Sequence, residues 1–507
     1  MRKGIESKDI LMSAQVLEHR YWEWVLGREV GPGYPLPAYA LSDVTIMPWH
    51  STISPYEPVL DVNAGPVRLK VPFLSAPMDT VTGEVLAAAM SDFGGCGIIY
   101  RSRKADEQLA WVEHALRHKT CLVEKPICLK RDDTVSEAQM ILDTKGFSTI
   151  PIVGDDGKLD GIVFTRDVNF RWHMDEPVSK WMMPVKRLKK VDTRTSFLKI
   201  QKRLRNEQQC SVLPVVDDEG RLAGIYFMKD VVDADPSAHG GKPTVGMAIN
   251  EGQEDIARAR AGIDLGVSMI VIDSSHGNCI PVIEQVKRLR EMVGSKKVCI
   301  VAGNVADIDG YLRLSEAGAD LVKLGVGPGS ICSTSEGTGV GYPMFTLIQK
   351  ISFAKRTAEG LGYRMAGIVA DGSINTPGDV VKALSAGADL VMAGKMFVAA
   401  SESISYVKFG LKDGKVIYRG MASKEAIKER NAGRYGKGKR APEGVSGRGE
   451  WRGPLRTWFP QTLELVRGGL AHTGSRTISE LQKYCIETLG AWALLTPAGR
   501  EQNAPRV

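Results

Sequence analysis

The stretch MIVIDSSHGNCIPVIEQVKRLREMVGSKKVCIVAGNVADIDGYLRLSEAGADLVKLG, residues 269–325, decides the fold. Three short runs in it are apolar nearly throughout: Met269–Ser274, Val298–Gly303 and Leu321–Gly325. Strands that are buried on both faces of a parallel sheet have this composition. Between the runs, Pro281–Met292 and Asp307–Ala317 space their apolar residues as amphipathic helices do. The stretch therefore predicts consecutive parallel β-α-β units.

The same alternation continues on both sides of this stretch. Further strands are predicted at Val71–Met78, Gly97–Arg101, Val245–Asn250, Gly367–Ala370 and Leu390–Ala393. Further helices are predicted at Gly83–Phe93, Glu254–Leu265 and Pro377–Ala386. Eight strands favour an α/β fold that closes as a (β/α)₈ (TIM) barrel, with active-site loops at the carboxyl ends of the strands. A doubly wound open sheet is the competing fold, and the strand count disfavours it.

An internal repeat interrupts this pattern after the second strand. Residues 147–168, FSTIPIVGDDGKLDGIVFTRDV, match residues 210–231, CSVLPVVDDEGRLAGIYFMKDV, at a constant offset of 63. Each copy predicts a strand, an acidic-glycine turn, a second strand and a helix start. An amphipathic stretch precedes each copy, at Val135–Lys145 and Ser196–Glu207. The sequence thus predicts an inserted domain over residues 121–235, built from two α-β-β-α units.

The repeat resembles a tandem of cystathionine-β-synthase-type (CBS) motifs. In that family the closing Thr and Asp contact the ribose of an adenine or guanine nucleotide. The resemblance therefore makes Thr165, Asp167 and Asp230 candidates for binding a regulatory nucleotide. Met228 stands in the second copy where the first has Thr165, so one site has lost its hydroxyl. A purely structural insertion is the alternative.

One loop concentrates glycine around a single thiol. Residues 325–343, GVGPGSICSTSEGTGVGYP, contain six glycines and Cys332. Ordering so many glycines is costly unless the conformation is used for something. Exposed backbone N–H groups and a nearby helix start can make a thiol nucleophilic. A lone cysteine is more often a small buried hydrophobe, but this loop favours a catalytic Cys332.

From about Ala40 to Leu481 the chain resembles the IMP dehydrogenase / GMP reductase family. The resemblance rests on PFLSAPMDTVTG, IDSSHGN, AGNV, GVGPGSICSTSEGTGVG, ADGSINTPGDVVKALSAGAD and YRGMAS. It implies that Cys332 attacks C2 of a purine nucleoside monophosphate while hydride passes between C2 and a nicotinamide. In the dehydrogenase direction water then cleaves the resulting thioimidate to xanthosine monophosphate (XMP).

The resemblance also implies roles for individual residues. The catalytic set is Cys332, Thr334, Arg434, Tyr435 and Glu443. The substrate-binding set is Ser330, Asp371, Gly372, Ser373, Gly394, Lys395, Tyr418, Gly420, Met421, Ala422 and Glu443, with Asp371 on the ribose hydroxyls. The cofactor-binding set is Asp273, Ser274, Ser275, Gly325, Val326 and Gly327. Carbonyls of Gly327, Gly329 and Cys332 match a monovalent-cation site, typically K⁺.

The direction of the reaction depends on whether water is activated. Arg434 and Tyr435 lie in a glycine- and lysine-rich stretch suited to a mobile flap, predicted over about 422–450, and PEGVSG at 442–447 matches dehydrogenases. These favour an NAD-dependent IMP dehydrogenase. TGVGYP, TPGDVVKA and the short interval before Glu443 favour the alternative, an NADPH-dependent GMP reductase. A non-catalytic nucleotide sensor is a minor alternative, which the presence of Cys332 disfavours.

Composition and charge limit the partners and the cellular location that we expect for the protein. The 507 residues carry a net charge of only +7, so nucleic acid is not expected as a partner. The eight cysteines form no Cys-x-x-Cys pair, and no apolar run could cross a membrane, so we expect a cytoplasmic protein. The expected parts are an N-terminal extension (1–40), the barrel (41–120 and 236–490) and a C-terminal tail (491–507). The family resemblance implies a homotetramer that pairs into octamers through the CBS domain.

Overall fold

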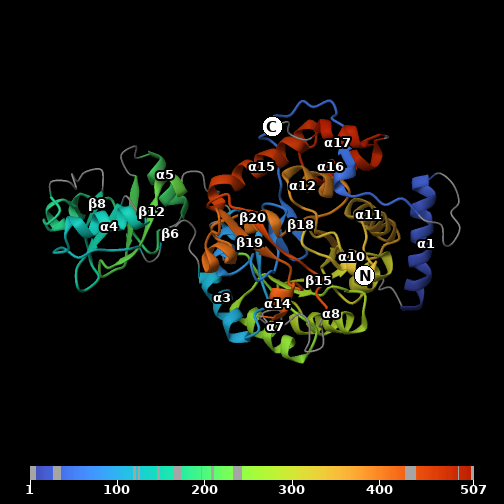
Figure 1. Ribbon diagram of the computed structural model, residues 1–507, viewed down its shortest axis with the longest axis horizontal. Coiled ribbons are helices and arrows are strands. Elements are labelled where there is room, and N and C mark those ends of the chain that lie inside the picture. The colour runs from blue at the N-terminus through green and yellow to red at the C-terminus, as the bar shows by residue number, and fades with distance from the viewer. Residues whose placement is uncertain are drawn as a thin grey trace. The chain divides into compact units, whose positions relative to one another are not determined.

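The computed structural model describes residues 7–26, 36–117, 122–123, 126–145, 149–164, 173–195, 197–206, 211–231, 243–428, 441–488 and 490–503. The chain forms two compact units: residues 1–117 together with 243–507, and residues 118–242. Figure 1 shows the elements of both units. The smaller unit is inserted in the larger one between its second and third barrel strands.

The larger unit contains a closed barrel of eight parallel strands. In order around the barrel they are β4 (Phe73–Ser75), β5 (Cys96–Ile99), β13 (Val245–Ile249), β14 (Met269–Asp273), β15 (Cys299–Val305), β16 (Leu321–Leu324), β17 (Gly367–Asp371) and β18 (Leu390–Ala393). The barrel closes where β18 pairs with β4, through Val391 and Phe73. All eight predicted strands and the barrel are confirmed, and the open sheet is excluded.

Alternate residues of each strand bury opposite faces. In β14, Met269 and Val271 pack inside the barrel, whereas Ile270 and Ile272 pack beneath the surrounding helices. The nearly continuous apolar runs in the sequence follow from this two-sided burial, because neither face of the strand meets water.

Helices surround the barrel, and the five predicted ones are present. They are α2 (Glu84–Asp92), α7 (Gln253–Leu265), α8 (Ile280–Val293), α9 (Ile308–Glu316) and α12 (Pro377–Ser385). Not predicted were α3 (Ala105–Arg117), α10 (Thr334–Thr338), α11 (Met344–Gly360), α13 (Lys395–Val398), α14 (Lys424–Lys428), α15 (Leu455–His472), α16 (Ile478–Glu487) and α17 (Pro497–Asn503). None of the helices in the described part of the chain combines the length and hydrophobicity needed to span a bilayer.

Six short strands form three two-stranded sheets outside the barrel among the described residues. They are β1 (Val44–Ile46), β2 (Val62–Ala64), β3 (Val67–Leu69), β19 (Lys415–Arg419), β20 (Ser446–Glu450) and β21 (Trp492–Leu494). β1 pairs with β21 and β19 with β20, both antiparallel. The N-terminal helix α1 (Ser7–Leu26) contacts α9 and α11, so part of the N-terminal extension packs on the barrel.

The smaller unit contains two sheets, three α-helices and two short 3-10 helices (Val178–Lys180 and Val185–Arg187) among its described residues. One sheet is β7 (Thr149–Val153), β8 (Leu159–Phe164) and β9 (Met183–Pro184); the other is β10 (Val191–Asp192), β11 (Val212–Val216), β12 (Leu222–Phe227) and β6 (Leu122–Val123). The α-helices are α4 (Val135–Lys145), α5 (Phe197–Asn206) and α6 (Met228–Val231).

The two sequence repeats adopt the same hairpin. Thr149 pairs with Phe164 and Val212 with Phe227, and the register shifts at equivalent points, before Val153 and before Val216. The copies also bond reciprocally: Leu159 N donates to Gly220 O at 3.1 Å, and Leu222 N donates to Gly157 O at 3.0 Å. The smaller unit therefore has an approximate internal two-fold symmetry.

Candidate active site

Most of the predicted site residues line one cavity at the carboxyl ends of the barrel strands. Those lining it are Asp273, Ser275, Gly325, Val326, Gly327, Gly329, Ser330, Cys332, Thr334, Asp371, Gly372, Ser373, Gly394, Lys395, Tyr418, Gly420, Met421, Ala422 and Glu443. Ser274 does not line it. Arg434, Tyr435, Thr165 and Asp167 lie outside the described residues, as does the side chain of Asp230 on α6.

Cys332 lies on the exposed side of this cavity, two residues before α10. Its amide donates to Gly329 O at 2.9 Å, which forms a tight turn. Its thiol is 3.2 Å from Thr334 Oγ1, and that hydroxyl is 3.3 Å from Glu443 Oε2. A continuous hydrogen-bonded path therefore leads from the thiol to a carboxylate. Such a path can carry the thiol proton away when sulfur acts as a nucleophile.

Backbone pairing brings Glu443 to the cysteine loop. Ser333 N donates to Glu443 O at 3.1 Å, and Val445 N donates to Ile331 O at 3.0 Å. On the other side, Glu443 N donates to Ala422 O at 3.1 Å. The segment around Glu443 thus lies between the cysteine loop and the loop after β19, which explains how a residue more than a hundred positions away reaches Thr334.

Lys323 on β16 is a central residue of the site that the sequence analysis missed. Its side chain is fully buried, and its Nζ lies 2.7 Å from Asp273 Oδ1 and 3.1 Å from Asp371 Oδ2. A buried charge is tolerated only when it is paired, and here one ammonium serves two carboxylates. Lys323 thereby joins the predicted cofactor side of the cavity to the predicted ribose side.

Asn304 completes this polar cluster. Its Nδ2 donates to Gly325 O and to Asp371 Oδ2, both at 2.9 Å. Its Oδ1 is buried and has no hydrogen-bond partner among the described residues. Asn304 also lines the cavity, so the cluster that orients Asp371 borders the space for a ligand.

The loops after β17 and β18 form the opposite wall. Gly372 has φ of 109°, and Gly394 has no room for a side chain because a Cβ there would lie 2.7 Å from Tyr418 Oη. Both backbones can therefore approach a ligand closely, as phosphate-binding loops do. Burial raises the pKa of Tyr418, so its phenol stays neutral and can donate a hydrogen bond. Lys395 is exposed at the cavity and can face an anion.

A second buried ion pair, also missed, fixes the loop that carries Met421. Arg419 donates to Asp79 Oδ2 through Nε at 3.1 Å and Nη2 at 2.8 Å, with both side chains buried. Asp79 N is 3.2 Å from Met421 Sδ. The loop after the first barrel strand and the end of β19 are thereby held together next to the cavity.

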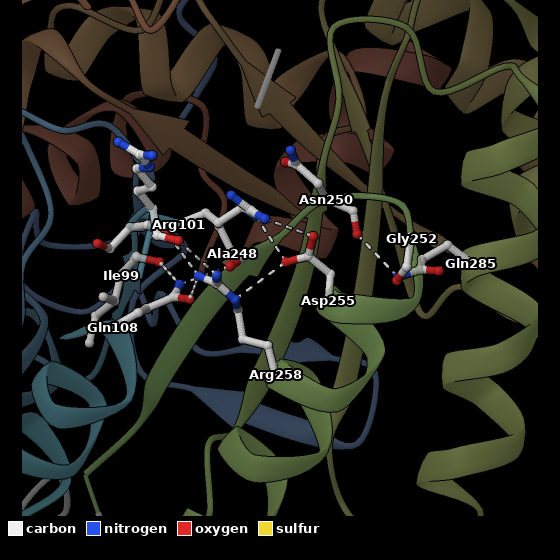
Figure 2. A network of polar contacts seen from close by, with 11 residues as sticks. Ile99, Arg101, Gln108, Ala248, Asn250, Gly252, Asp255, Arg258 and Gln285 are labelled. Atoms are coloured by element: carbon white, nitrogen blue, oxygen red, sulfur yellow. Dashed lines mark hydrogen bonds and ion pairs between the residues drawn. The ribbon is translucent and has the colours of Figure 1, made fainter. Parts of the chain in front are cut away.

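A buried polar network fixes the strand ends on another part of the carboxyl face (Figure 2). Gln108 Nε2 donates to Ala248 O at 2.8 Å, and Arg258 Nη1 donates to Gln108 Oε1 at 2.9 Å. Asp255 accepts two bonds from Arg101, at 2.9 and 3.1 Å. Burial lowers the pKa of Arg258. The network joins α3 and α7 to the carboxyl ends of β5 and β13, so it holds the loops after these two strands in place.

Comparison with known proteins identifies the family of the chain. The family model for the IMP dehydrogenase / GMP reductase domain matches residues 38–503. The chain belongs to this family. The resemblance inferred from the motifs is thus confirmed, and the chain shares the fold of this family of oxidoreductases.

The proteins similar to this chain include both IMP dehydrogenases and GMP reductases. The inosine-5′-monophosphate dehydrogenase of Aquifex aeolicus is 34% identical over 465 residues, covering 89% of this chain and 92% of its own. A crystal structure of GMP reductase from Trypanosoma brucei has a TM-score of 0.71 and 28% identity, covering 93% of this chain and 99% of its own. Its complex with guanosine 5′-monophosphate has a TM-score of 0.65 and 29% identity, covering 94% and 98%.

Proposed function

We propose that this chain is an IMP dehydrogenase, which oxidises IMP to XMP through a covalent Cys332 adduct. The observation that carries the proposal is the hydrogen-bonded path from Cys332 through Thr334 to Glu443, three residues that line the cavity. The curated IMP dehydrogenases that match about nine tenths of the chain support this direction, as does the PEGVSG segment at 442–447.

The nucleotide would lie across the cavity from the β17–β18 loops to Cys332. Gly372, Ser373 and Gly394 present backbone groups to the phosphate, with Lys395 adding a positive charge. Asp371, already oriented by Lys323 and Asn304, would accept hydrogen bonds from the ribose hydroxyls. Met421 and Ala422 would then lie against the base, near the sulfur of Cys332.

The chemistry requires the thiol to lose its proton as sulfur bonds to C2. Thr334 can accept that proton while its own passes to Glu443, so the Glu443 carboxylate would act as the base that makes the sulfur nucleophilic. In the second half of the reaction Arg434 and Tyr435 would activate water. As hydrolysis releases the sulfur as a thiolate, the proton held by Glu443 would return to Cys332 through Thr334.

The residues on the other wall fit a nicotinamide cofactor. Ser275, Asn304 and Gly325 through Gly327 line the same cavity as Cys332. Bound NAD would supply the hydride acceptor. Asp273 contributes through Lys323, which holds its carboxylate in place.

Three further proposals extend the same function. K⁺ would bind carbonyls of Gly327, Gly329 and Cys332, which belong to one loop; turnover in K⁺ against Li⁺ tests this. The smaller unit would be a tandem CBS domain that binds adenine or guanine nucleotides through Thr165, Asp167 and Asp230; a shift in melting temperature with added ATP or GTP tests this.

The chain would form a tetramer that pairs into octamers. Mass photometry with and without these nucleotides tests this.

GMP reductase is the second candidate. The Trypanosoma brucei GMP reductase structures align over nearly the whole of both chains, which supports this alternative. The same Cys332 adduct would then form with loss of ammonia from GMP, and NADPH would supply the hydride.

One pair of assays decides between the two directions. Purified enzyme is mixed with IMP and NAD, or with GMP and NADPH, and absorbance of the reduced nicotinamide is followed. We expect turnover in the first mixture. Turnover only in the second would transfer the assignment to GMP reductase, and Cys332→Ser serves as the inactive control in both.

A further inference from the structure

Helix α1 lies outside the residues that the family model matches, yet it packs firmly on the barrel. The match begins at residue 38, and α1 spans Ser7–Leu26. Its Tyr21 and Trp22 are 1% and 3% exposed. The Tyr21 ring meets the Phe353 ring of α11 edge to face, with centroids 5.8 Å apart. A helix buried this well is a fixed part of the larger unit.

An ion pair between a partly exposed Glu18, 37% accessible, and a buried Lys350 continues from α1 into α11. Glu18 Oε1 accepts hydrogen bonds from Trp22 Nε1 at 3.1 Å and from Lys350 Nζ at 2.9 Å. The Lys350 side chain is only 5% exposed. Because an ammonium group in such a place needs a negative partner, Glu18 determines where the end of Lys350 rests.

Lys350 in turn covers the neck of the cysteine loop, which is the point where Val326 and Tyr342 meet. Its Nζ lies 4.5 Å from the centre of the Tyr342 ring, a cation–π arrangement. Burial raises the pKa of Tyr342 to about 12, so the ring is neutral at physiological pH. Tyr342 N donates to Val326 O at 3.1 Å, and this bond closes the loop that contains Cys332.

We propose that α1 is a positioning element of the catalytic loop, in which Glu18 holds Lys350 over Tyr342 and so keeps the Val326–Tyr342 neck closed. The inference rests on the proposed function for the role of Cys332. A glycine-rich loop loses much conformational entropy when it is ordered, so it needs contacts of this kind at its base. Without the Glu18 carboxylate, the Lys350 ammonium turns toward water, Tyr342 loses its cover and the neck opens more often.

The alternative is that α1 only adds stability to the barrel, and a matched pair of variants separates the two. Glu18→Gln removes the carboxylate next to Lys350. Glu23→Gln removes a carboxylate from the same helix. The partner of Glu23 is the exposed His19, and neither residue belongs to the series of contacts from Glu18 through Lys350 to Tyr342. Both keep the shape of the side chain, so a general loss of α1 would affect them alike.

The first measurement is amide hydrogen exchange over residues 326–343, which needs no knowledge of the reaction. We expect exchange there to be roughly fivefold faster in Glu18→Gln and unchanged in Glu23→Gln. Lys350→Met should have the same effect as Glu18→Gln, and the double variant should be no worse than either single one, because they break one contact chain. Equal exchange in Glu18→Gln and the parent would overturn the inference.

The second measurement is turnover of the full chain with its nucleotide. Glu18→Gln should lower kcat by about tenfold with little change in KM, because the loop holds the reacting groups rather than the substrate. A fall in KM and kcat that Glu23→Gln shares would refute the positioning role. If the parent turns over neither IMP nor GMP, the proposed function fails, whereas the exchange experiment still tests the contact of α1 with the loop.

Discussion

Replacing Lys323 with methionine tests the charge cluster that organises the active site. Methionine nearly preserves the length of the side chain but removes the ammonium that lies 2.7 Å from Asp273 and 3.1 Å from Asp371. Two carboxylates would then remain close together without their shared counter-ion, and Asp371 would keep only the hydrogen bond from Asn304 in this cluster.

The size of the effect follows from burial. Breaking a fully buried ion pair costs about 3–5 kcal/mol, and the Asp371 side chain is 22% exposed, so the lower end, about 3 kcal/mol of unfolding free energy, is expected. For catalysis, one charged hydrogen bond that orients Asp371 is lost, worth about 1.5–3 kcal/mol, which corresponds to a 10- to 100-fold fall in kcat/KM.

The assays are urea denaturation and steady-state kinetics with the nucleotide that the parent uses. Lys355→Met is the matched control, because Lys355 pairs with the single carboxylate of Asp389 at 2.9 Å and neither residue lines the cavity. It should cost about 1 kcal/mol or less and leave kcat/KM unchanged. If Lys323→Met is as stable and active as Lys355→Met, the cluster does not organise the site.

Three other substitutions test the remaining parts of the site. Thr334→Val should lower kcat by about 100-fold or more because it interrupts the proton path to Glu443, measured by pre-steady-state kinetics; an unchanged rate would remove Thr334 from the mechanism. Asp79→Asn should reduce the unfolding free energy by about 3 kcal/mol, since it removes the carboxylate charge that lies 2.8 Å from buried Arg419; denaturation decides, and a change below about 0.5 kcal/mol contradicts it. Arg434→Ala should leave hydride transfer intact but slow hydrolysis of the adduct, measured by stopped flow; equal slowing of both steps argues against a flap role.

The barrel could be predicted because its physical cause is local. A strand that is buried on both faces must be apolar at consecutive positions, and MIVID in β14 shows this directly. The repeat at an offset of 63 likewise appears as two hairpins with the same register. In both cases residues close together in the sequence determine the local structure, and tertiary contacts stabilise it.

The partners of the charged residues could not be predicted in this way. Lys323 stands out in the apolar run LVKLG, which signals a buried charge, but its two carboxylate partners lie on other strands and are set by the register of the barrel. The contact of Thr334 with Glu443 depends on backbone pairing between distant loops. Helix α1 has no strong apolar stripe, so its packing became visible only in three dimensions.

The position of the inserted unit has a consequence for how the chain is made. β5 pairs with β13, Ile98 opposite Gly246, although residues 118–242 separate them along the chain. During translation at about 5–20 residues per second, the edge of β5 therefore waits roughly ten seconds for its neighbour to leave the ribosome. An unpaired apolar strand edge invites aggregation, so the nascent barrel is exposed to this risk during the interval. Early collapse of the insertion would shorten the effective loop and bring the two edges together sooner.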